Sequence, residues 1–154
     1  MATSIDAIIL AALLEHLEAI DLTPALDIAM PGVSFTPPVY DGNGADYRKG
    51  DPKPYLAAWF MPAKTNRVTI DVGPQQKLGV LQVSVMWPAN KGQVKPLDVA
   101  GAVIDHFNNR FFLVSGVRIT VIDEPWLAPP VQSADQLNFP VTINYSAFGP
   151  EIAP

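Results

Sequence analysis

The chain contains no cysteine among its 154 residues. This absence excludes disulfide bonds, iron–sulfur clusters, thiol catalysis and every zinc site that uses cysteine ligands. Charged residues are also few, because Asp, Glu, Lys and Arg together make up 16% of the chain, against about 25% in a typical soluble domain. So few charges predict that part of the surface faces a partner molecule or another copy of the chain rather than water.

Basic residues and long apolar runs are scarce as well. With 10 Lys and Arg against 15 Asp and Glu, the formal net charge is −5. This balance argues against sequence-specific nucleic-acid binding, because phosphate neutralisation needs clustered Lys and Arg. The longest apolar run, Ala7 to Leu14, is far short of the roughly 20 residues that span a bilayer. We therefore expect no membrane partner, and a soluble protein of the cytoplasm or of a structure assembled there.

Residues that could carry catalysis or bind metal are few and scattered. His16 and His106 lie on different predicted helices, where a solvent-edge or capping role is the simplest interpretation. The stretch from Asp41 to Asp46 resembles a calcium loop only superficially, since Ala45 occupies its third ligand position and Pro52 stands in place of the closing glutamate. No nucleophile elbow, phosphate-binding loop or metalloprotease motif occurs. The sequence thus predicts no catalytic residue, no cofactor and no metal, and therefore no enzyme.

What the chain does contain is proline, 16 residues in all, which divides it into short elements. Apolar residues at helical spacing predict a helix over Ser4–Ile20, with Ser4 as its cap, and a second helix from Pro96 through Phe111. Alternating patterns predict the strands, which cover residues 28–35 (irregular), 55–61, 78–87, 117–122 and 139–148. Prolines 125, 129 and 130 are expected to bound a loop that contains Trp126.

These elements predict an α+β fold in two layers. We expect a mostly antiparallel sheet of about four to five strands, with both helices packed on its apolar face. Residues 1–154 are taken as a single domain, because too little chain precedes the Pro- and Gly-rich stretch to form another. Residues 36–54 and 63–76 are predicted to be long loops.

Two features suggest interface residues. Leu10 and Leu14 widen the apolar face of the first helix, which suits a helix packed against its own sheet and also against a neighbouring subunit. Basic residues gather in the two long loops of an otherwise acidic chain. They are expected either to be solvated loop charges or to contact an acidic partner or a neighbouring copy; these residues are Lys64, Arg67 and Lys77, with Tyr47, Arg48 and Lys49.

Several blocks resemble, in order and spacing, the tail terminator-like proteins of long-tailed bacteriophages. Residues 54–63, Pro-Tyr-Leu-Ala-Ala-Trp-Phe-Met-Pro-Ala, are similar to a block of that family, and residues 79–92 resemble its strand that ends in an aromatic-Pro-Ala-x-x-Gly turn. The helix at 100–107, then Gly116-Val117-Arg118-Ile119 and the strand at 139–145, follow in the expected order. The stretches 36–51 and 149–154 have no counterpart that we can place.

The resemblance implies a structural virion protein with no catalysis. Such proteins form a ring, usually a hexamer, at the head-proximal end of the tail tube, where the ring ends tube polymerisation and docks the head. The implied partners are further copies of the chain, the tail tube protein and a head completion or connector protein. The alternatives are another neck protein (a stopper or an adaptor), or a small cytoplasmic enzyme or ligand-binding domain with a pocket under Trp59 and Trp126.

Overall fold

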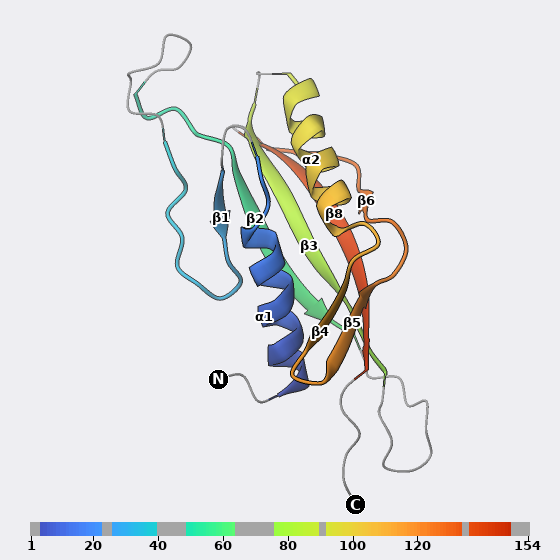
Figure 1. The fold of residues 1–154 in the computed structure, drawn as a ribbon. Helices are drawn as coiled ribbons and strands as arrows, with labels where there is room; N and C mark the ends of the chain where they lie inside the picture. Colours follow the sequence, from blue (N-terminus) through green and yellow to red (C-terminus); the bar gives the residue numbers. More distant parts are fainter. Residues whose placement is uncertain are drawn as a thin grey trace, which may run out of the picture.

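The computed structural model describes residues 4–22, 26–39, 49–63, 76–89, 92–133 and 136–148. These residues form two helices and one sheet of eight strands, and Figure 1 shows the helices packed against the sheet. In chain order the elements are α1 (Ile5–Glu18), β1 (Asp27–Ala29), β2 (Tyr55–Pro62), β3 (Gln76–Pro88), α2 (Val94–Phe107), β4 (Phe111–Val114), β5 (Val117–Val121), β6 (Trp126–Leu127), β7 (Val131–Gln132) and β8 (Gln136–Phe148). None of the described helices is long and apolar enough to cross a membrane.

The first helix begins where its sequence provides a cap. The Ser4 hydroxyl accepts a hydrogen bond from the Ala7 backbone N–H at 3.1 Å, as predicted. Asp6 lies in the first turn, where a negative charge interacts favourably with the positive end of the helix dipole. The apolar face then turns inward: Ile9, Leu13 and Leu17 are fully buried. This helix lies against β4 and β5, whereas α2 lies against β3 and β8.

The centre of the sheet is the long antiparallel pair of β3 and β8. Its register runs from Gln76 opposite Phe148 to Pro88 opposite Gln136. Alternate residues of both strands face the helices and are buried, among them Leu81, Val83, Phe139 and Ile143. Burial of these aliphatic and aromatic side chains between sheet and helices is the main source of the fold's stability.

Strands β5, β6 and β7 pair in succession with the other edge of β8. They form one interrupted strand, because Ile122 and Ala128, which lie between them, still donate backbone hydrogen bonds to β8 at 2.9 Å. Pro125, Pro129 and Pro130 fall within this stretch, and a proline cannot donate to the ladder. The residues around Trp126 are therefore edge strand rather than the loop that the sequence predicted.

The sheet also differs from the prediction in size and direction. It has eight strands instead of four to five, in the order β1-β2-β3-β8-β5-β4 with β6 and β7 on β8. It is mixed, where a mostly antiparallel sheet was predicted, because β1 pairs with β2 in parallel. The predicted strand at 28–35 is reduced to Asp27–Ala29, since Pro31 and Gly32 form a turn directly after it.

The second helix is displaced relative to its prediction. It begins at Val94 and ends at Phe107, so Phe111 is not on its stripe but starts β4. The helix ends because Asn108 is extended, with φ of −67° and ψ of 130°, and Asn109 follows with a left-handed φ of 57°. Ser115 and Gly116, with φ of 52° and 80°, then form the two-residue turn of a hairpin between β4 and β5.

Candidate functional site

The two histidines meet at the ends of the two helices, an arrangement that the sequence did not predict. Their rings stack with centroids 3.8 Å apart and planes only 6° from parallel. Each ring Nε2 bonds the backbone carbonyl of the other histidine, at 2.6 Å from His16 and 2.5 Å from His106. Because a carbonyl can only accept, Nε2 carries the proton in both rings. The pair therefore joins the last turn of α1 to the last turn of α2.

This histidine pair is a structural clasp, because it ties the C-terminal ends of the two helices to each other. Burial lowers the pKa of His16 below its usual 6.5, and the neighbouring His106 and Arg110 lower it further, against the opposing effect of the His106 carbonyl. Both Nε2 atoms are engaged with backbone carbonyls, so in a neutral ring the lone pair lies on Nδ1. Among the described residues, no group of three or more His, Asp or Glu side chains could hold a metal ion. The only sequence signal for the pair is that both histidines lie near helix C-termini.

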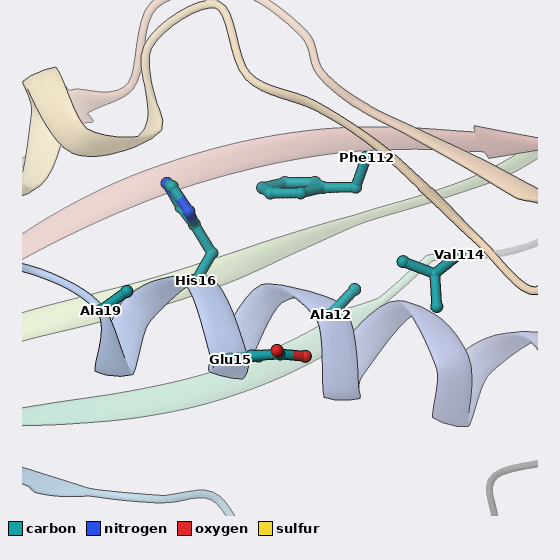
Figure 2. A pocket seen from close by; sticks show the side chains of 6 residues that line it. All are labelled: Ala12, Glu15, His16, Ala19, Phe112 and Val114. Atoms are coloured by element: carbon teal, nitrogen blue, oxygen red, sulfur yellow. The ribbon is translucent and has the colours of Figure 1, made fainter.

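Beside this clasp runs a groove between α1 and β4. It has a volume of about 330 Å³ and is lined by Ala12, Glu15, His16, Ala19, Phe112 and Val114. Figure 2 shows α1 along one side, and on the other the ring of Phe112 beside His16 and the side chain of Val114 beyond Ala12. The rings of His16 and Phe112 have centroids 5.1 Å apart. Small alanines on the helix side leave the space open, and the lining combines apolar side chains with the polar side chains of Glu15 and His16.

The groove lies along a free strand edge. In the described part of the chain β4 pairs with β5 alone, so its other edge has no partner strand. The Arg110 carbonyl accepts from Val121 N–H at 2.9 Å. In an antiparallel pair every second residue bonds to the partner strand, so the residues of β4 that bond to β5 are those two and four positions after Arg110. Phe111 and Leu113 consequently direct their backbone N–H and C=O groups away from β5, toward the free edge. Natural proteins usually protect such an edge.

The exposed apolar side chains of this hairpin add to the same surface. Leu113 is 64% exposed, Phe111 54% and Val114 40%. Arg118, also exposed, is opposite Leu113 in the register, and its guanidinium lies 5.8 Å from the centroid of the Phe111 ring. A four-residue strand that exposes three large hydrophobic residues at its free edge is typical of a surface that another segment covers.

The structure places the sequence-predicted interface residues in two groups. Leu10 and Leu14 are half-buried on α1, and Leu14 packs against the chain's own core. Lys77 lies at the start of β3 and pairs with Asp6 of α1 at 3.7 Å, in a partly exposed ion pair. Lys49 is exposed in a turn, and the remaining four lie outside the described residues: Lys64, Arg67, Tyr47 and Arg48. Sequence reasoning missed the β4 edge because it assigned Phe111 to the second helix.

The pocket envisaged under Trp59 and Trp126 is not where the groove lies. Ala58 is buried on the helix side opposite Val83, so Trp59, the next residue, projects from the other face of the sheet. Trp126 projects from that same face. It pairs with Thr142, whose side chain points away from the helices because its neighbour Val141 is buried on the helix side. The two indoles are 47% and 51% exposed.

Comparison with known proteins gives both a fold and a family. A solved protein structure superposes with a TM-score of 0.70 at 25% sequence identity, covering 99% of this chain and 99% of the other. No curated protein matches the chain. The family model described as phage tail terminator protein matches residues 8–145, which run from Ile8 within α1 to Tyr145 within β8 and include α2 and the β4 edge. The chain therefore belongs to the phage tail terminator family.

Proposed function

We infer that this protein forms a closed ring, most simply a hexamer, at the head-proximal end of a phage tail tube. The ring ends tube polymerisation there and offers a docking face to the head completion or connector protein. The observation that carries this proposal is the match of residues 8–145 to the tail terminator family, a family of tail structural proteins. In this function the protein needs no catalytic residue and no cofactor.

The shape of the sheet supports a ring. A closed ring of identical subunits needs a heterologous interface, with two different patches on each subunit. The sheet ends in two unlike strands: β1 at one end, three residues with an exposed Asp27, and β4 at the other, with exposed Phe111 and Leu113. Unlike ends favour head-to-tail contacts over self-pairing of one edge, which would close a dimer.

The composition supports an assembled state as well. Charged residues are only 16% of the chain, while Trp59, Met61 and Trp126 remain about half exposed on the sheet face that the helices leave uncovered. The centre of an interface is depleted in charge and enriched in aromatic residues and Met. We assign the tail tube protein and the head completion protein as the partners of the assembled ring.

Electron microscopy of two samples tests the proposal. Tails assembled by a phage or prophage that lacks this gene should be longer than normal and fail to join heads, and the gene supplied in trans should restore both properties. The purified protein, or the protein on isolated tails, should form rings in negative stain. A protein that remains monomeric both in solution and on tails would refute the ring, and tails of normal length in its absence would refute termination.

A further inference from the structure

We propose that the groove between α1 and β4 receives residues 67–72 of a neighbouring copy, which add to the free edge of β4 as an extra strand. The inference rests on the proposed ring and names the contact that joins its subunits. It follows from the edge, the groove beside it, and the sequence of the segment.

The edge and the groove together define what can bind. Outward N–H and C=O groups of Phe111 and Leu113 require an extended backbone, as in recognition by strand addition. Alternate side chains of that strand would share the face of Phe112 and Val114 and enter the groove over Ala12 and Ala19. Because α1 lies against β4 and borders the groove on this side, a single extended segment suits the site better than the edge of another folded sheet.

The chain's own sequence contains one segment suited to this site outside the described residues. Residues 67–72 read Arg-Val-Thr-Ile-Asp-Val, so Val68, Ile70 and Val72 alternate with polar residues. This period of two in β-branched residues is the pattern of a half-buried strand. With the three aliphatic side chains in the groove, Asp71 lies on the opposite face, the face of Leu113 and the exposed Arg118, so the two charges are complementary.

The short flanks of the segment indicate that it comes from another copy. From the end of β2 to a strand beyond β4 there are five strand spacings in the sheet order, a path of about 24 Å along the sheet. The three residues between Ala63 and Arg67 can extend over only about 14 Å. The residues from Gln76 back to Val72 can also extend over only about 14 Å. The path along the sheet from β3 to a strand beyond β4 is about 19 Å. These lengths favour a segment from another copy over the chain's own.

Cross-linking tests the contact directly, because the natural chain has no cysteine. Val114→Cys and Ile70→Cys are made as separate proteins, one with a mass tag, and mixed under oxidising conditions. We expect the mixed disulfide dimer to dominate over both homodimers, and a chain with both substitutions to give a ladder that ends at the ring. Val94→Cys, on α2 and 75% exposed, is the matched control and should not link to Ile70→Cys. Homodimers of Val114→Cys alone, or links only within one chain, would overturn the proposal.

A pair of adjacent charge substitutions gives an independent readout. Ile70→Asp should weaken ring assembly by about a hundredfold or more, because a carboxylate would lose its hydration in the groove, where Glu15 offers a like charge rather than a partner. Thr69→Asp, one residue away on the opposite side of the strand, should retain assembly, and both proteins should keep the natural thermal midpoint. Assembly is measured by native mass spectrometry. Equal assembly of the two variants defeats this contact and leaves the proposed function standing. Absence of rings for the natural protein, in solution and on tails, defeats the proposed function itself.

Discussion

Gly79 and Gly101 should respond in opposite ways to the same substitution, alanine. Gly79 lies in β3 directly opposite Tyr145 of β8. A Cβ atom at Gly79 would meet the Tyr145 ring 2.6 Å from Cζ and 2.8 Å from Cε2, and come closer still to the hydroxyl oxygen. Gly101, on α2, has nothing within 4 Å of the same added atom. Separations under 3 Å cannot be accommodated without movement of the ring or the backbone.

The magnitude follows from how firmly Tyr145 is held. Its side chain is fully buried and stacks on Phe60, with centroids 5.8 Å apart. Overpacking such a site costs about 1–3 kcal/mol, and the entropic gain of replacing glycine by alanine returns only about 0.5–1 kcal/mol. We expect Gly79→Ala to lower the free energy of unfolding by about 1–2 kcal/mol. The midpoint should fall by about 2–8 °C. Gly101→Ala should raise it by about 1–4 °C, since alanine is the better helix former.

The assay is thermal and urea unfolding of both variants and of a double-mutant cycle. In a Tyr145→Val background the ring is gone, so Gly79→Ala should become neutral or stabilising, with a coupling of about 1 kcal/mol or more. If Gly79→Ala were as stabilising as Gly101→Ala, or if its cost were unchanged without the ring, the packing of Tyr145 over Gly79 would be wrong. Either outcome would mean that Gly79 is not opposite Tyr145, and therefore that the register of β3 against β8 is different.

Three further predictions concern the clasp and the loop. Because the native pKa of His16 is below its unfolded value of 6.5, the unfolded state binds more protons, so stability should be full above about pH 6.5 and fall as the pH drops through the window below it. His16→Gln should reduce that fall in thermal midpoint, and an unchanged pH profile would contradict it. His106→Ala should cost about 1–3 kcal/mol, measured by urea unfolding, because the His16 carbonyl loses a donor, while elemental analysis finds no bound metal before or after; assembly lost in a variant that stays folded and oligomeric would show that the histidine does more. Replacing residues 64–75 by a short Gly-containing turn should keep the thermal midpoint and give over-long tails, and tails of normal length would show that the loop is dispensable.

Much of the architecture could be predicted from local pattern alone. Ser4 capped α1 as expected because a hydroxyl before an apolar helical face satisfies a free N–H. The alternation around Leu81, Val83 and Val85 predicted β3, which pairs with β2 in antiparallel register. The ordered blocks also predicted the tail terminator family, which the match of residues 8–145 confirms. These features depend on neighbours in sequence, or on residue order along the chain.

What only the tertiary structure decided depends on contacts between distant residues. The stretch Phe111–Val114 continues a helical apolar stripe in the sequence, yet the helix ends at an extended Asn108 and pairing with β5 makes the stretch a strand. His16 and His106 are 90 positions apart, and nothing local indicates that their rings would stack. Helical and strand periods can share apolar positions over a few residues, so packing decides between them. The free edge of β4 and its groove therefore could be recognised only from the tertiary structure, in which β4 packs beside α1.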